Sequence, residues 1–145
     1  MPEPLTAAET ADLRAFAGTM IPASPRYAVP GADDDRIFAD ILRSLERDRD
    51  DIARALQRLA VLAAGRFADL PPGRRLDVAN QLRVEGGLPL AALTRVILLC
   101  YYRDDRVMRS LGQEPRPPFP KGHVVDQGDW SLLDPVKKRT PFYRR

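Results

Sequence analysis

Six prolines lie in the last thirty-odd residues of this chain, and they exclude any long helix or central β-strand there. They are Pro115, Pro117, Pro118, Pro120, Pro135 and Pro141. The same stretch carries large apolar side chains, whereas a disordered tail is normally poor in aromatic residues. We therefore expect residues 113–145 to form an extended C-terminal arm that packs on a surface, either of this chain or of another protein.

The first two-thirds of the chain have the spacing of helices. Thr6 and Glu9 form a capping-box pattern. Apolar residues then recur at intervals of three and four, and prolines or glycines interrupt them. We expect helices to begin near Thr6, Asp33–Asp35, Asp48–Asp51, Pro72, Pro89 and Asp104. No stretch alternates apolar and polar residues as a half-buried strand does, so the predicted fold is all-α.

Within this pattern, residues 67–72 read as a break, and Leu42 and Leu76 belong to faces that should be buried. Residues 89–101 are apolar almost all round, which favours the central position in a bundle. The prediction is a bundle of five or six helices over residues 1–112, followed by the arm. A single turn capped by Asp129 is expected within the arm.

Composition narrows the class of protein. The chain has 23 basic and 20 acidic residues, a balance too even for a dedicated nucleic-acid binder. A single cysteine excludes an intrachain disulfide, and the longest apolar run is too short to cross a bilayer. The first residues show no secretion signal, so we expect a cytoplasmic protein; a subunit exported to the periplasm together with a signal-bearing partner would have the same sequence features.

No constellation of residues indicates catalysis by this chain. His123 lies in a proline–glycine context without a second metal ligand nearby, and Cys100 lies in the most apolar helix. The acidic groups Asp33–Asp35 and Asp104–Asp105 stand where helices should begin, so capping explains them. Glycine-rich phosphate-binding loops are absent from the sequence. We expect no enzyme activity, metal or cofactor in the isolated chain.

Two basic clusters, residues 137–139 and 144–145, flank Phe142 and Tyr143. Cations beside aromatic rings also occur in proteins that bind single-stranded nucleic acids. A self-contained helical regulator or nucleic-acid-binding module is therefore an alternative. Because aspartates lie among the clusters, and because Arg and aromatic residues are enriched in protein interfaces, we favour a protein partner. The residues predicted to contact it are Tyr102, Arg106, Phe119, Trp130, Leu132, Leu133, Phe142 and Tyr143.

Several short segments resemble the gluconate 2-dehydrogenase subunit 3 family. They are residues 20–24 (MIPAS) and 30–32 (PGA) in the first half, then the stretch from 101–104 (YYRD) to Gly112, and the turn at 117–122 (PPFPKG). Many members of that family carry a twin-arginine leader, and this chain starts directly at its first predicted helix.

The resemblance implies a small, non-catalytic subunit. Family members accompany a large flavin-dependent sugar or polyol dehydrogenase of the glucose–methanol–choline type, and they are thought to help it fold, stay soluble or be exported. FAD and the catalytic groups would then belong to the large subunit of a hetero-oligomer. The resemblance supplies no catalytic residues to place on this sequence.

Overall fold

Helices make up the regular structure of the part of the chain that we describe. The computed structural model describes residues 4–117, 119, 121–122 and 124–140. It divides the chain into two units, Met1–Pro115 and Arg116–Arg145, which we call the body and the arm. The only β contact among the described residues is an isolated antiparallel bridge between Ser24 and Val29. The predicted all-α fold is confirmed, and the boundary between units falls three residues beyond the predicted one.

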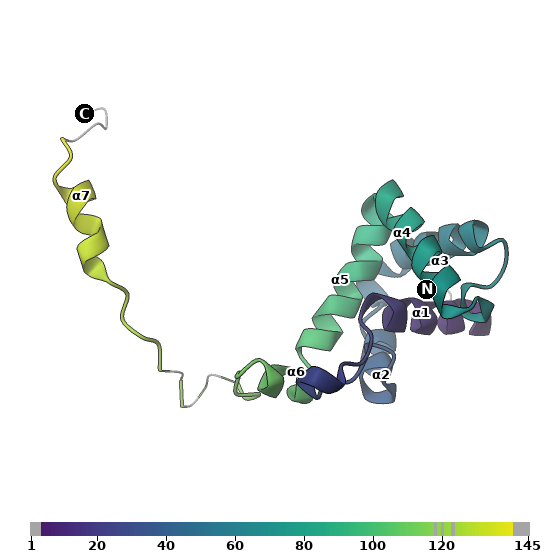
Figure 1. Cartoon of the computed structure of the whole chain (residues 1–145), viewed down its shortest axis with the longest axis horizontal. Helices are drawn as coiled ribbons and strands as arrows, with labels where there is room; N and C mark the ends of the chain where they lie inside the picture. Colours follow the sequence, from purple (N-terminus) through teal and green to yellow (C-terminus); the bar gives the residue numbers. More distant parts are fainter. Residues whose placement is uncertain (1–3, 118, 120, 123, 141–145) are drawn as a thin grey trace. The chain divides into compact units, whose positions relative to one another are not determined.

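The first helix, α1 (Ala7–Met20), begins at the predicted capping box (Figure 1). The Thr6 hydroxyl accepts the backbone N–H of Glu9 at 3.2 Å, and the Glu9 carboxylate accepts the N–H of Thr6 at 2.8 Å. Leu13, Phe16 and Ala17 are buried on one face. A reciprocal cap of this kind satisfies two amides that the first turn leaves free.

A loop with the short 3₁₀ helix η1 (Pro25–Tyr27) leads to α2 (Asp35–Arg43). The loop folds back tightly on itself. A Cβ atom at Gly31 would lie 2.9 Å from the Ala23 nitrogen, so a side chain there would clash with backbone. The carboxylate of Asp34 caps α2 by accepting N–H groups of Arg36 and Ile37, as the acidic run predicts.

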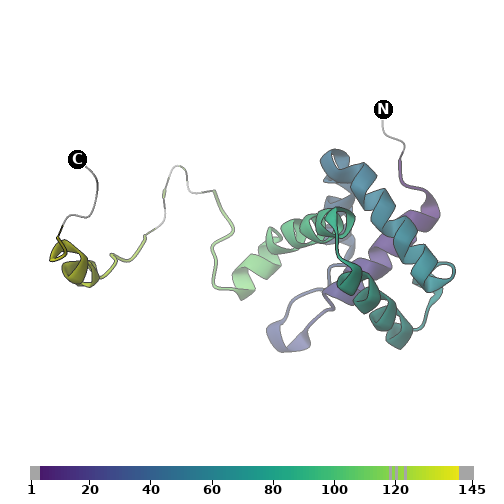
Figure 2. The same cartoon turned by 90° about the horizontal axis from the view of Figure 1, so that it is seen from above.

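The core lies between α1, α2, α3 (Arg49–Ala63), α4 (Pro72–Glu85) and α5 (Leu88–Tyr102), and Figure 2 shows the body from above. Helix α3 follows the 3₁₀ helix η2 (Glu46–Asp48), and it packs against both α4 and α5. It ends at Ala64, whose φ of 52° is left-handed. The last helix of the body, α6 (Asp105–Ser110), begins at the Asp104 cap.

The predicted break at residues 67–72 contains a core element. It forms the 3₁₀ helix η3 (Phe67–Asp69), and Phe67 is fully buried with its ring centroid 6.1 Å from that of Phe16. The carboxylate of Asp12, itself buried, accepts the N–H of Ala68 at 2.8 Å. The segment between α3 and α4 is therefore part of the core, because the Phe67 ring is buried there and the Asp12 carboxylate accepts one of its backbone N–H groups.

Two predicted core residues are exposed. Leu42 and Leu76 have 36% and 54% of their surface exposed, and the predictions that they are buried are wrong. In α4 the buried positions are Val78 and Leu82, one turn apart. Helix α5 contacts α2, α3 and α6, but Leu98 and Leu99 on its outer face remain exposed. The apolar residues of α5 thus contribute both to the core and to an exposed surface.

The arm contains one short helical stretch. Residues Trp130–Leu133 form the 3₁₀ helix η4, and α7 (Asp134–Lys137) continues it. Pro135 fits there because the first turn of a helix does not need its N–H group. The described residues of the arm therefore contain no long helix, but their helical stretch begins at the predicted Asp129 cap and is longer than the predicted single turn.

Candidate partner-binding surfaces

The helical turn of the arm is held by its own sequence. The carboxylate of Asp129 accepts the backbone N–H of Ser131 at 3.0 Å and its hydroxyl at 2.6 Å. These bonds hold the pKa of Asp129 below its usual range. Because the carboxylate stays ionised at neutral pH, it caps the turn and fixes the direction in which the following side chains project.

The apolar side chains of this turn have no cover among the described residues. Every described residue from 117 to 140 is exposed. Trp130 has 66% of its surface exposed and Leu132 has 73%, whereas core leucines such as Leu93 have none. Exposed apolar residues occur singly on any surface, but such a concentration in one segment marks a site of interaction.

Spacing places several of these side chains together. In a 3₁₀ turn, residues three apart lie above one another, so Trp130 and Leu133 share a face. Val136 follows three residues later in α7, on the same side. We call these three residues, together with the adjacent exposed Leu132, the apolar stripe. Val136, like the exposed Val124 and Val125, was not among the predicted contact residues, although a search for apolar residues at intervals of three would have found it.

Of the other predicted contact residues of the arm, Phe119 lies among the described residues. Phe119 is described and has 83% of its surface exposed. Phe142 and Tyr143 lie outside the described residues, as does His123. The contacts predicted at Phe119, Trp130, Leu132 and Leu133 remain predictions, and their exposure is the property that a partner contact requires.

Tyr102 lies on the body, at the end of α5. It has 53% of its surface exposed and packs edge-on against Tyr101, with ring centroids 5.3 Å apart. The Tyr101 hydroxyl in turn donates to the carbonyl of Pro30 at 3.2 Å. Leu98 and Leu99 are exposed one turn earlier on the same helix. Tyr102 therefore stands at the end of an outward apolar face, on a rigid support.

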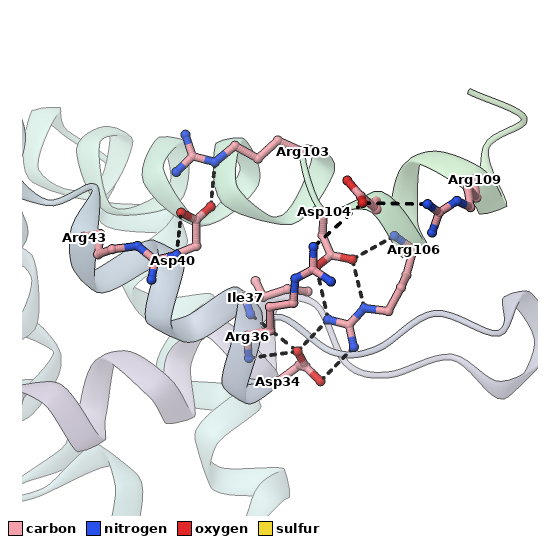
Figure 3. A network of polar contacts seen from close by, with 10 residues as sticks. Asp34, Arg36, Ile37, Asp40, Arg43, Arg103, Asp104, Arg106 and Arg109 are labelled. Atoms are coloured by element: carbon pink, nitrogen blue, oxygen red, sulfur yellow. Dashed lines mark hydrogen bonds and ion pairs between the residues drawn. The ribbon is translucent and has the colours of Figure 1, made fainter. Parts of the chain in front are cut away.

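Arg106, the other predicted contact on the body, is engaged within the body (Figure 3). Its guanidinium donates to Asp34 at 2.6 Å and to Asp104 at 2.9 Å. The hydrogen bond to Arg106 is the main reason why the pKa values of both carboxyls lie below their usual range, and these contacts raise the pKa of Arg106. Arg106 thus joins the caps of α2 and α6, a structural role that needs no partner.

A second polar cluster joins α2 to α5. Arg103 donates to Asp40 and to the Ser44 hydroxyl, both at 2.6 Å, and Arg43 approaches Asp40 at 3.4 Å (Figure 3). The side chains border a hollow of about 230 Å³ that Cys100 also lines. Burial raises the pKa of the Cys100 thiol, so it stays protonated at neutral pH. The cluster pairs charges and offers no activated nucleophile.

An apolar groove of about 260 Å³ lies between α1, α4 and α5. Met20, Leu76 and Leu90 line it, with Thr94 at one side. The exposure of Leu76, which contradicts the predicted core, contributes to this surface. The described residues of the body therefore carry two apolar surfaces, this groove and the outer face of α5.

The acidic groups that we considered as metal ligands act as caps and ion pairs. Asp34 and Asp104 are N-caps, and Asp35 pairs with Arg14. Within the described part of the chain, no group of three or more His, Cys, Asp or Glu residues could hold a metal ion. Nor does any described helix have both the length and the apolar character required to cross a membrane.

Comparison of the chain with protein families, with curated proteins and with solved structures found no match. The resemblance to the gluconate 2-dehydrogenase subunit 3 family therefore remains a hypothesis that rests on the short segments quoted above.

Proposed function

We propose that this chain is a non-catalytic small subunit that stabilises a large FAD-dependent oxidoreductase of the glucose–methanol–choline type, acting on a sugar or polyol. The observation that carries the proposal is the uncovered apolar stripe of the arm. Its indole and leucine side chains lie on a capped turn and are exposed. Burial of such side chains against a partner is strongly favourable, and Trp is enriched among interface hot spots.

The division of labour follows from the same chemistry. The polar clusters around Asp34, Asp40 and Asp104 are accounted for by caps and ion pairs, which is compatible with a chain whose partner supplies the catalytic groups. FAD, the substrate site and the catalytic base would belong to the large subunit. The nature of that subunit comes from the sequence resemblance.

The test is co-expression of this chain with a flavoprotein of the proposed type from the same genome, followed by purification through a tag on this chain. We expect the two chains to purify together, with the yellow flavin colour on the larger one. Trp130→Ala should weaken the complex by about 2 kcal/mol, roughly thirtyfold in Kd, if Trp130 is a hot spot.

Tyr27→Ala is the matched control, because Tyr27 is an aromatic residue of the body that is similarly exposed, at 63% against 66%. It should leave the Kd unchanged. Failure of any such flavoprotein to purify with the wild-type chain would contradict the proposed function. Equal affinities of wild type and Trp130→Ala would remove Trp130 from the interface.

A further inference from the structure

The excess positive charge of the chain lies entirely in the arm. Residues 116–145 contain seven Lys and Arg against three Asp, whereas residues 1–115 contain sixteen Arg against seventeen Asp and Glu. A protein with evenly scattered charges would distribute this excess over both units. The segregation indicates that the arm meets a surface whose charge differs from that of its own body.

Most arginines of the body already have a carboxylate partner. Arg58 and Glu85 form a two-point pair with distances of 2.7 and 2.6 Å, and Arg95 lies 2.6 Å from Asp48. The arginines that form ion pairs within the body are Arg14, Arg36, Arg43, Arg54, Arg58, Arg66, Arg74, Arg95, Arg103, Arg106 and Arg109. The charge of the body is thus largely satisfied internally.

The basic residues that follow the apolar stripe are in a different situation. Lys137 approaches Asp134 at 3.5 Å, an exposed pair of little strength. Lys138 and Arg139 form no ion pair with any described residue, and both are exposed. Two cations that form no ion pair among the described residues therefore follow directly after the exposed apolar side chains.

We propose that the arm docks its apolar stripe into a groove of the large flavoprotein subunit, and that carboxylates along the rim of that groove bind Lys138 and Arg139. The inference rests on the proposed function and specifies the surface of the partner. A groove with an apolar floor and an acidic rim covers the stripe and supplies both missing counterions. Charges at the rim steer association and fix the orientation of the docked turn.

The charge pattern favours a protein over a lipid surface or a nucleic acid. Asp126, Asp129 and Asp134 accompany the cations, and each would be repelled by a uniformly anionic surface. The helical stretch from Trp130 to Lys137 is also much shorter than the amphipathic helices that lie in membrane interfaces. A protein groove can place carboxylates beside the cations and leave the aspartates in water.

The experiment measures the Kd between the full chain and the purified flavoprotein, at low and at high salt, for wild type and for two charge-reversal variants. The test variant is Lys138→Glu with Arg139→Glu. The control is Arg26→Glu with Arg47→Glu, which changes the net charge equally at two exposed positions of the body that form no ion pair with any described residue. We expect the test variant to bind about tenfold or more weakly at low salt, with a smaller salt dependence, and the control to bind within about twofold of wild type.

Each other outcome overturns the inference in a distinguishable way. If the test variant binds as tightly as the control, the acidic rim is wrong although the proposed function stands. If the wild-type chain binds no flavoprotein, both fail. Binding of the wild-type chain to phosphatidylglycerol vesicles or to single-stranded DNA, lost in the test variant while flavoprotein affinity is kept, assigns Lys138 and Arg139 to that surface. Self-association that only the test variant loses assigns them to a second copy of the chain.

Discussion

The body and the arm use the same kinds of side chains under opposite conditions. In the body, residues such as Leu13, Ile41 and Leu93 are fully buried, and arginines face carboxylates. In the arm, Trp130 and Leu132 are exposed, and Lys138 has no ion pair among the described residues. The body buries a continuous apolar core and pairs most of its arginines, whereas the apolar side chains of the arm are exposed and two of its cations have no ion pair among the described residues. This difference is what makes the arm the candidate for recognition.

The helix caps of the body and the cap of the arm also differ in what they stabilise. The caps of α2 and α6 serve a packed core, because Arg106 joins both to one ion-pair cluster. The Asp129 cap orders a turn whose apolar side chains are exposed. A turn that is already formed in the free chain loses less conformational freedom when a partner binds it, so this local order favours binding.

The largest expected difference concerns matched leucines in the two units. Leu93→Ala should lower the free energy of unfolding by about 2–5 kcal/mol, because it opens a cavity at a fully buried site. Leu132→Ala removes the same atoms from an exposed site and should change stability by less than about 0.5 kcal/mol. Urea denaturation followed by circular dichroism measures both. Comparable losses would show that Leu132 belongs to a folded core.

Asp12 offers the next largest effect, and it tests the core element that the sequence did not reveal. Asp12→Ala should cost about 1–3 kcal/mol, because it leaves the N–H of Ala68 without its partner next to buried Phe67. Asp12→Asn keeps an oxygen acceptor and should recover part of the loss. If both variants unfold at the same urea concentration as wild type, the contact between α1 and η3 contributes little.

Arg106 distinguishes an internal from an external role at a site that we first predicted to bind a partner. Arg106→Ala should cost about 1–2 kcal/mol, because buried Asp104 loses its guanidinium partner and keeps only the backbone N–H of residue 106 and the longer 3.6 Å contact to Arg36. The affinity of the Arg106→Ala variant for the flavoprotein should equal that of wild type. A variant of normal stability with weaker binding would return Arg106 to the interface.

The smallest effect is the pH dependence of that cluster. The folded-state pKa values of Asp34 and Asp104 lie below their usual range, chiefly because Arg106 donates to both. The stability that they contribute is therefore complete above about pH 4 and is lost as the pH falls toward their folded values. Wild type should lose about 1 kcal/mol more than Arg106→Ala between about pH 5 and pH 2. Parallel stability curves would contradict this linkage.

Much of the body could be predicted because local signals and packing agree there. The Thr6–Glu9 box, the Asp34 and Asp104 caps and the positions of the helices follow from the sequence. The exposure of Leu76 could not be predicted, because helical spacing alone leaves two phases open in α4 and the packed face falls on Val78 and Leu82. Spacing is a weak guide where a helix has few apolar residues.

Contacts between distant residues explain the remaining differences. Asp12 and Ala68 are 56 residues apart in the sequence, and Arg106 and Asp34 are 72 apart. No pattern among neighbouring residues therefore predicts either contact. The prolines correctly excluded a long helix from the described residues of the arm, and Asp129 indicated where its helical stretch begins, although that stretch is longer than one turn. The apolar stripe was only partly predicted. Val136 belongs to it because it lies in α7, three residues after Leu133, and not because its side chain is large.

Trp130 provides the most direct test of the account, because it is the only tryptophan of the chain. Its fluorescence therefore reports on the arm alone, while circular dichroism reports mainly on the helices of the body. We predict that in the purified full chain Trp130 is readily quenched by acrylamide, and that its emission stays nearly constant through the thermal unfolding of the body. A shielded indole whose emission changes cooperatively with the helices would show that the arm is covered by its own chain, and it would contradict the central claim.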